Sequence, residues 1–191
     1  MRVIMLSAPG AGKGTQCRRL AEATGVAHIS SGDLLRAEIA SGSDIGRRAA
    51  TYAARGDLVP DDVLFEILVP VVLDADRATG GYLLDGFPRT MAQARRAAEI
   101  GLRHQIGGDA VVYLTAPEPV LVDRLLTRAQ REGRADDTPD VIRHRIAVFK
   151  RQTRPLVDYY RRRGLLLEVD ADRPEDDVQA DLRSRLPLEA R

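Results

Sequence analysis

The chain has 191 residues, and its 29 basic and 28 acidic side chains leave a formal net charge of +1. This balance argues against general binding to nucleic acid, and no apolar run approaches the roughly 20 residues that span a membrane. The single cysteine, Cys17, excludes an intrachain disulfide and a multi-cysteine zinc site. We therefore expect one soluble domain in a reducing, cytoplasmic setting. Only two of the basic residues are lysines, Lys13 and Lys150.

Short apolar runs alternate with longer amphipathic stretches along the whole chain. The apolar runs predict strands at residues 3–6, 28–29, 82–85, 110–115 and 165–169. The amphipathic stretches predict helices near 13–23, 61–73, 90–100, 117–130, 140–163 with an interruption at Pro155, and 174–186. Glycines at intervals between residues 30 and 60 indicate short helices and turns there. Buried strands that alternate with helices favour a doubly wound parallel sheet, whose ligands bind at the carboxyl ends of the strands.

The first predicted strand runs into a glycine-rich turn. Residues 7–15 read SAPGAGKGT and nearly match the phosphate-binding pattern G-x-x-x-x-G-K-[ST]. Glycines let successive backbone N–H groups turn toward phosphate oxygens, and the next helix presents its positive end. Lys13 can reach the outer phosphates as a compact point charge, a role that the planar fork of arginine does not fit. This segment predicts a nucleoside triphosphate site.

The turn departs from the pattern at two positions. Ser7 occupies the place of the first glycine, and it would carry a strain of about 1 kcal/mol if the backbone there needs a positive φ. Gly14 occupies the place of the usual Ser or Thr, so Thr15 supplies the hydroxyl expected to face the metal-bound phosphate.

Three further segments narrow the prediction. Residues 30–36 read SSGDLLR and follow the second strand, while residues 84–90 read LDGFPRT and are followed by Gln93. Residues 133–137 read GRADD and precede a helix that carries Arg145. With the phosphate loop, these segments follow one another as in adenylate kinase over essentially the whole chain. The chain resembles the short-lid type of this nucleoside monophosphate kinase family.

The resemblance implies an architecture. It is a single P-loop kinase domain over 1–191, with a five-stranded parallel sheet flanked by helices. The core would comprise residues 1–29, 60–126 and 138–191. A small helical insert that binds the nucleoside monophosphate would comprise residues 30–59, and the lid would comprise residues 127–137. The lid has neither the length nor the cysteines of the zinc-holding type, so no structural zinc is expected. The implied partners are ATP, AMP and ADP, with Mg²⁺ bound alongside ATP, and the enzyme would be a monomer without nucleic-acid or membrane partners.

The resemblance also implies residue roles by position. The catalytic residues would be Lys13, Arg89, Arg124, Arg128, Arg134 and Arg145. ATP would contact Gly10, Ala11, Gly12, Lys13, Gly14, Thr15, Arg124, Arg128 and Arg173. AMP would contact Ser31, Arg36, Asp57, Leu58, Val59, Gly86, Phe87, Pro88, Arg89, Gln93, Arg134 and Arg145. No side chain would bind the metal directly, and Asp85 and Thr15 would lie near Mg²⁺.

The implied reaction is reversible transfer of a phosphoryl group from Mg-ATP to AMP, which gives two ADP and maintains the balance of adenine nucleotides. The acceptor oxygen is already ionised at neutral pH, so no general base is needed, and catalysis rests on positioning and charge. One alternative is a UMP/CMP kinase, but Thr90 and Gln93 favour AMP because a carboxamide can make two hydrogen bonds to a purine edge. The other alternative is a non-catalytic nucleotide-binding module, which the loss of a phosphate-binding arginine would support; none is missing.

The three histidines and the cysteine have no chemical role in this interpretation. The three histidines, His28, His104 and His144, belong to no motif, and we interpret them as structural. Cys17, on the helix after the phosphate loop, is interpreted as a small buried apolar side chain.

Overall fold

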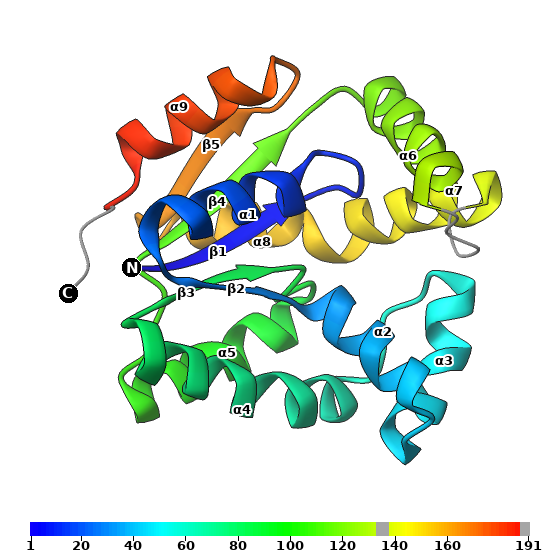
Figure 1. The fold of residues 1–191 in the computed structure, drawn as a ribbon, viewed down its shortest axis with the longest axis horizontal. Helices are drawn as coiled ribbons and strands as arrows, with labels where there is room; N and C mark the ends of the chain where they lie inside the picture. The colour runs from blue at the N-terminus through cyan, green and yellow to red at the C-terminus, as the bar shows by residue number, and fades with distance from the viewer. Residues whose placement is uncertain (133–137, 188–191) are drawn as a thin grey trace.

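The computed structural model describes residues 1–132 and 138–187 and contains one parallel sheet (Figure 1). Its strands are β1 (Arg2–Ser7), β2 (Ala27–Ser30), β3 (Tyr82–Asp85), β4 (Ala110–Thr115) and β5 (Leu166–Asp170). They are arranged in the order β2-β3-β1-β4-β5, and every neighbouring pair is parallel. The predicted doubly wound, five-stranded α/β fold is confirmed, and the strands have nearly the predicted bounds.

The two faces of the sheet are covered because successive side chains of a strand point to opposite sides. On β1, Val3 and Met5 pack into one apolar cluster, and Ile4 and Leu6 pack into another. The first cluster includes side chains of α1 (Lys13–Thr24) and α9 (Glu175–Arg185). The second includes side chains of α4 (Asp61–Thr79), α5 (Met91–His104) and α8 (Pro155–Arg161). A continuous apolar strand is therefore the expected sequence at the centre of this fold.

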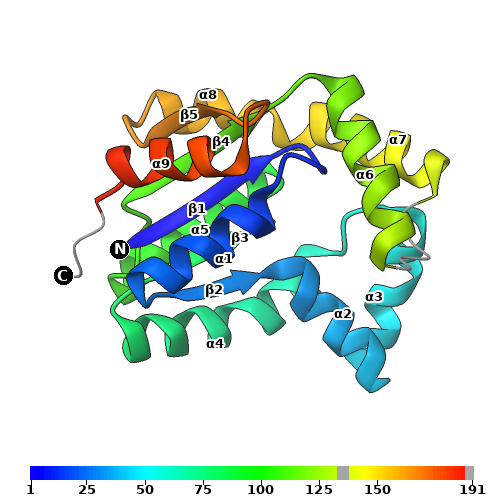
Figure 2. The same ribbon diagram turned by 45° about the horizontal axis from the view of Figure 1, so that its top comes forward.

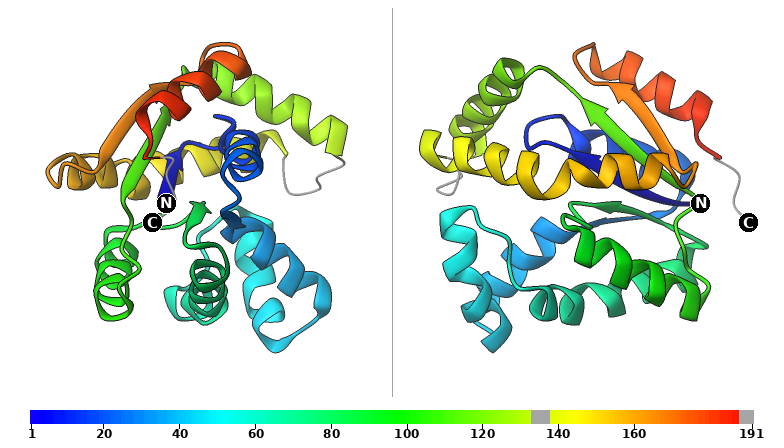
Figure 3. Two further views of the ribbon diagram at one scale, coloured as in Figure 1. Left: turned by 60° about the vertical axis from the view of Figure 1, so that its left-hand side comes forward. Right: turned by 180° about the vertical axis from the view of Figure 1, so that it is seen from behind.

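The remaining helices lie near the carboxyl ends of the strands. They are α2 (Ser31–Ser41), α3 (Asp44–Arg55), α6 (Glu118–Glu132) and α7 (Pro139–Val148), and they project from the same side of the sheet (Figures 2 and 3). Helices α2 and α3 lie within the predicted insert. Ala49 and Val59 of the insert form a small apolar cluster with Val63 of α4, apart from the two clusters against the sheet. The predicted lid comprises the end of α6 and residues 133–137, and the latter lie outside the described residues.

Two helices show how proline acts in this chain. The prediction that the helix from residue 61 ends near residue 73 is wrong, because α4 continues past Pro70 to Thr79 and ends where Gly80 adopts a left-handed conformation. Its last turns are held to β1 by Arg2, whose guanidinium donates to both carboxylate oxygens of Asp76 at 2.6 and 3.0 Å. The predicted interruption at Pro155 is confirmed.

The interruption at Pro155 takes the form of a π-helical turn, η1 (Phe149–Thr153), between α7 and α8. The backbone N–H of Arg154 donates to the carbonyl of Phe149 at 2.9 Å, the wider spacing that defines such a turn. No helix in the described part of the chain is long and apolar enough to cross a membrane.

Candidate active site

A cleft of about 910 Å³ opens where the predicted motifs meet, beyond the carboxyl ends of β1, β2 and β3. Parallel strands place the loops that follow them at one edge of the sheet, so segments far apart in the sequence converge there. Most of the predicted site residues line this cleft: Gly10, Ala11, Gly12, Lys13, Gly14, Thr15, Arg36, Leu58, Asp85, Gly86, Pro88, Arg89, Arg124, Arg128 and Arg145.

The phosphate loop needs glycine at Gly10 for two reasons. Its φ is +88°, and a side-chain Cβ there would lie 2.6 Å from the backbone oxygen of Leu121. Gly12 also has a positive φ of +83°, and α1 begins directly after it. The first turn of α1 contains no acidic residue, so nothing on that turn offsets its positive N-terminal end. The loop is therefore suited to an anion.

Lys13 is held back against the strand that precedes the loop. Its Nζ donates to Ser7 Oγ at 2.8 Å and to the Ser7 backbone oxygen at 3.3 Å. Burial lowers the pKa of Lys13; the negative charge of Asp85 acts in the opposite sense, and the positive charge of Arg89 lowers the pKa further. The ammonium thus lies in a site that favours an added negative charge.

Ser7, the departure from the phosphate-loop pattern, is accommodated without the strain that a positive φ would bring. Ser7 keeps the strand conformation of β1. Among the described non-glycine residues a positive φ occurs at Gln105, and Ser7 does not have one. Its hydroxyl accepts from Lys13 and donates to the backbone oxygen of Ala8 at 2.6 Å. The serine therefore satisfies its own polar group and fixes the position of the Lys13 ammonium.

Arg89 lines the cleft and is fixed through its backbone and its Nε. Its N–H donates to Gln93 Oε1 at 2.7 Å, its carbonyl accepts from Thr153 Oγ1 at 2.8 Å, and its Nε donates to the Gly86 carbonyl at 2.6 Å. Burial lowers the pKa of Arg89, Asp85 raises it, and the positive charge of Arg145 lowers it further. Arginines close enough to affect one another in this way form a ready site for a polyanion.

The carboxylate of Asp85 faces these cations from the end of β3. Burial raises its pKa, but the neighbouring His28 and the positive charge of Lys13 outweigh burial, so the net pKa of Asp85 is lowered. The side chain is therefore ionised at neutral pH. Thr15 lines the same cleft. A carboxylate and a hydroxyl suit Mg²⁺, which prefers oxygen ligands and keeps several of its waters.

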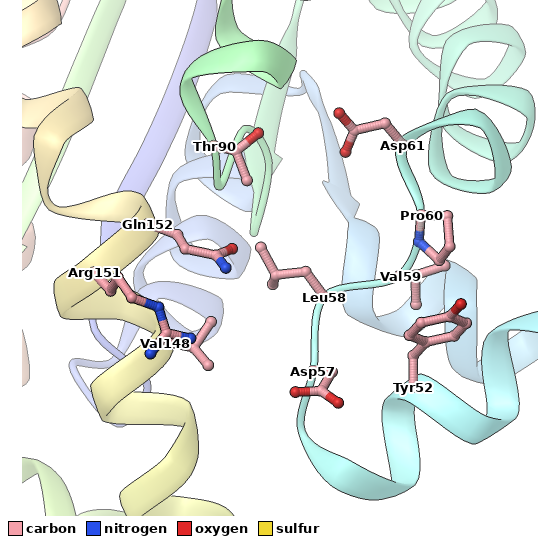
Figure 4. Close-up of a pocket in the computed structure, with 10 residues that line it drawn as sticks. All are labelled: Tyr52, Asp57, Leu58, Val59, Pro60, Asp61, Thr90, Val148, Arg151 and Gln152. Carbon is pink, nitrogen blue, oxygen red and sulfur yellow. The ribbon is translucent and has the colours of Figure 1, made fainter.

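A smaller cavity of about 400 Å³ lies beside the insert (Figure 4). Asp57 and Val59 line this cavity, and Leu58 lines both this cavity and the cleft. Figure 4 shows Leu58 pointing from the loop before α4 toward Thr90 and Gln152. The loop of residues 57–59, at the end of the insert, thus forms one wall of this cavity, and the π-helical turn contributes Arg151 and Gln152.

Gln93 is 1% exposed, and both ends of its carboxamide are engaged. Its Nε2 donates to Asp61 Oδ1 at 2.7 Å, while Oε1 accepts from the Arg89 N–H. Two hydrogen bonds from Gln93 to a purine therefore require these contacts to change. Ser31 and Phe87 are also buried and do not line the cleft.

Two predicted arginines are not placed in the cleft. Arg173 does not line it; its Nη2 binds Asp181 Oδ2 at 2.7 Å and its Nε binds the carbonyl of Asp170 at 3.1 Å. Arg134 lies outside the described residues. The roles assigned to both remain predictions.

Several lining residues were not predicted, among them Arg18, Asp123 and Arg131. On α6, Arg128 follows Arg124 by four positions and Arg131 follows Arg128 by three. Both spacings place side chains on one face of a helix, so the sequence could have indicated that Arg131 lines the cleft. Arg18 lies one turn after Gly14 on α1, where a similar argument applies.

A sequence model described as adenylate kinase matches residues 5–165 of the chain. The chain belongs to the adenylate kinase family. An adenylate kinase of Stenotrophomonas maltophilia is 48% identical over 182 residues, which cover 94% of this chain and 96% of that protein. The chain is 47% identical to an adenylate kinase of Kocuria rhizophila, in an alignment that covers 88% of this chain and 89% of the relative. It is 42% identical to an adenylate kinase of Thermobifida fusca, in an alignment that covers 93% of this chain and 94% of the relative.

Membership confirms the predicted activity. The enzyme is an adenylate kinase that transfers a phosphoryl group reversibly between ATP and AMP to give two ADP. The alternative of a pyrimidine-specific kinase and that of a non-catalytic module are not needed to explain either the motifs or the cleft.

Proposed function

We propose that the cationic residues of the cleft divide it into a donor half and an acceptor half. In the donor half, residues 10–15 hold the phosphates of ATP, while Arg124 and Arg128 on α6 bind its outer oxygens. In the acceptor half, Arg36 and Arg89 hold the phosphate of AMP. Arg145, with Arg134 from the lid, spans the two halves over the transferring group. The observation that carries this proposal is that the phosphate loop and five arginines from separate segments line one cleft: Arg36, Arg89, Arg124, Arg128 and Arg145.

This arrangement suits a transfer that needs no general base. The attacking oxygen of AMP is already ionised, so the protein must position two anions against each other and offset their charge. Cations gathered in one cleft become favourable when the negative charge of the transition state lies between them. Lys13, released from Ser7, adds a point charge at the transferring phosphoryl group.

The metal fits the same site. Mg²⁺ bound with ATP would neutralise charge on the phosphates. Asp85 would orient it through water, and the hydroxyl of Thr15 would face the metal-bound phosphate. The ionised state of Asp85 and its place among the cleft-lining residues support this assignment. We expect no structural zinc in the lid.

The proposal includes the movement of two segments about the core. The core would comprise residues 1–29, 60–126 and 138–191. The insert would comprise residues 30–59, and the lid would comprise residues 127–137. The insert packs on α4 through the small cluster of Ala49, Val59 and Val63, which is separate from the two clusters against the sheet. Closing both segments over the substrates would exclude water, which would otherwise accept the phosphoryl group.

The base of AMP would lie near residues 57–59 and Gln93, and Arg173 would lie near the adenine of ATP. For Gln93 we propose that the purine edge replaces its contact with Asp61. We further propose a monomer in the cytoplasm. Among the described residues, Leu102 is the one large apolar side chain that is exposed, so little apolar surface is left for self-association. The single cysteine is free and buried, which suits a reducing compartment.

The residue assignment is tested with a coupled assay that varies AMP and ATP separately. Replacing Arg36 by Lys keeps the charge but loses the two-pronged geometry, so we expect the KM for AMP to rise at least tenfold with little change in the KM for ATP. Arg47→Lys, on the exposed face of α3, is the matched control. The same assay with CMP, UMP and GMP in place of AMP should show a strong preference for AMP. Equal rises in both KM values would contradict the division of the cleft.

A further inference from the structure

Three side chains with metal-binding atoms meet behind the phosphate loop. They are Cys17 on α1, His28 on β2 and Asp85 at the end of β3. One ligand atom from each, a sulfur, a ring nitrogen and a carboxylate oxygen, lies within 4.8 Å of the other two. The register of the sheet fixes two of them, because β2 and β3 are paired with Ser30 opposite Asp85, two residues beyond His28. Neither the phosphate loop nor the three further sequence segments require this cluster of donors.

The histidine in this group has an unused polar atom. His28 Nε2 is buried and has no hydrogen-bond partner among the residues that the structure describes, and Asp85 Oδ2 lies 3.9 Å from it, beyond hydrogen-bond range. A buried polar atom without a partner costs free energy, so it calls for an explanation. Cys17, fully buried, is likewise a free thiol.

We propose that Cys17, His28 and Asp85 form an inhibitory site for a thiophilic divalent cation of the Zn²⁺ type. Thiolate, imidazole and carboxylate are the protein ligands that Zn²⁺ takes, at roughly 2.0–2.3 Å. Three atoms that lie within 4.8 Å of one another leave a central ion at most about 2.8 Å from each. Side-chain movements of less than about 1 Å would therefore complete three of four tetrahedral positions, and water would take the fourth.

Binding changes one covalent bond. The S–H bond of Cys17 breaks, its proton passes to solvent, and the sulfur binds the cation through the electron pair that remains. His28 binds through Nε2 and Asp85 through a carboxylate oxygen, and no oxidant or reductant is involved. The ion reaches the site from the nucleotide cleft, because His28 and Asp85 both line that cleft.

Occupation of the site would slow the enzyme, a consequence that rests on the proposed role of Asp85. A carboxylate bound to Zn²⁺ cannot orient the hydrated Mg²⁺ that accompanies ATP. The cation would also place positive charge next to Lys13, whose pKa already responds to Asp85. Inhibition should therefore be relieved by a zinc-selective chelator and by saturating Mg-ATP, which covers the entry route.

The binding site is tested by titrating the whole enzyme with Co²⁺, which replaces Zn²⁺ and gives a near-ultraviolet thiolate band when a cysteine binds it. We expect one equivalent to produce that band and Zn²⁺ to displace it. Cys17→Ala should abolish the band while keeping the basal activity, and His28→Gln should weaken Co²⁺ binding about tenfold or more. His104→Gln, on the exposed end of α5, is the control and should change nothing. Absence of the band from the wild type, or its persistence in Cys17→Ala, would overturn the site.

The inhibitory role is tested separately, by measuring turnover at fixed Mg-ATP and AMP against added Zn²⁺. We expect Cys17→Ala to need at least tenfold more Zn²⁺ for half-inhibition than the wild type, because Zn²⁺ bound to nucleotide affects both proteins alike. A thiolate band without any difference in inhibition would overturn the inhibitory role and would leave the adenylate kinase activity itself unaffected.

Discussion

The Nε2 atom of His144 lies 2.8 Å from Oδ1 of Asp57, which joins α7 to the loop that ends the insert. The same two segments touch at Gly56, where an added Cβ would lie 3.1 Å from side-chain atoms of both Val141 and Arg145. His144 belongs to no motif, yet it connects two of the units whose relative movement is proposed above. The contact is electrostatic and exposed, so it is suited to open and close with little cost.

The Asp57–His144 contact should show in the titration of the carboxylate. The hydrogen bond from His144 lowers the pKa of Asp57, with a further contribution from Arg55. A lowered pKa means that the contact stabilises the protein above the ordinary pKa of aspartate and is lost as the pH falls through the lowered value. We expect His144→Ala to move the pKa of Asp57 upward, measured by carboxyl-carbon NMR. Asp62, whose pKa is lowered by Arg48, is the internal control and should not move.

Replacement of Lys13 by arginine should remove most of the activity although the charge is kept. Lys13 is partly buried, and its ammonium already makes two contacts with Ser7 in a space shared with the charges of Arg89 and Arg128. A guanidinium is larger and planar, and it cannot present one point charge to the transferring phosphoryl group. We expect kcat to fall about 10²- to 10³-fold, the cost of losing one well-placed donor.

The chain supplies its own control for that substitution, because it has one other lysine. Lys150 is an exposed side chain on the π-helical turn and pairs with Glu118. Lys150→Arg keeps the charge and the partner, so turnover should remain within about twofold of the wild type, as for most exposed substitutions. Near wild-type turnover of Lys13→Arg in the same assay would refute the point-charge argument.

Ser7→Gly should separate the stability of the phosphate loop from its chemistry. The hydroxyl of Ser7 makes two hydrogen bonds, to Lys13 and to the Ala8 carbonyl, and glycine loses both while gaining freedom in the unfolded chain. We expect the free energy of unfolding to fall by about 1–2 kcal/mol. Turnover should be unchanged or higher, because Lys13 no longer has to leave a hydroxyl acceptor. A large loss of kcat would instead give the serine a positive part in catalysis.

Much of the fold followed from local pattern, for a physical reason that β1 illustrates. Val3 and Met5 face one cluster and Ile4 and Leu6 the other, so the strand is apolar throughout and is readily identified. The phosphate loop was equally predictable, because residues 10–15 need particular backbone conformations. The end of α4 was not, since the helix continues past the predicted end near residue 73 to the Gly80 cap, and its last turns are held by the pairing of Asp76 with the distant Arg2.

The parts of the site that escaped prediction depend on contacts between distant segments. Gln93 looked free to read a base, but Asp61, 32 residues earlier, takes one end of its carboxamide. Arg173 matched a position near adenine, but Asp181 on α9 binds its guanidinium. Pairings of this kind follow from the packing of helices against the sheet and leave no periodic signal in the sequence.

Gly46→Ala should loosen the insert without touching either nucleotide. Gly46 lies on α3 where that helix crosses α2, and an added Cβ would overlap the backbone carbonyl of Glu38. The two helices must separate to admit it, at a cost of about 1–3 kcal/mol, the usual range for overpacking. Because the insert carries Arg36 and the loop of residues 57–59, we expect the KM for AMP to rise several-fold while the KM for ATP stays nearly constant. Gly107→Ala is the control, since a Cβ there meets no atom within 4 Å. Parallel increases in both KM values for Gly46→Ala would show that the insert is not an independent unit.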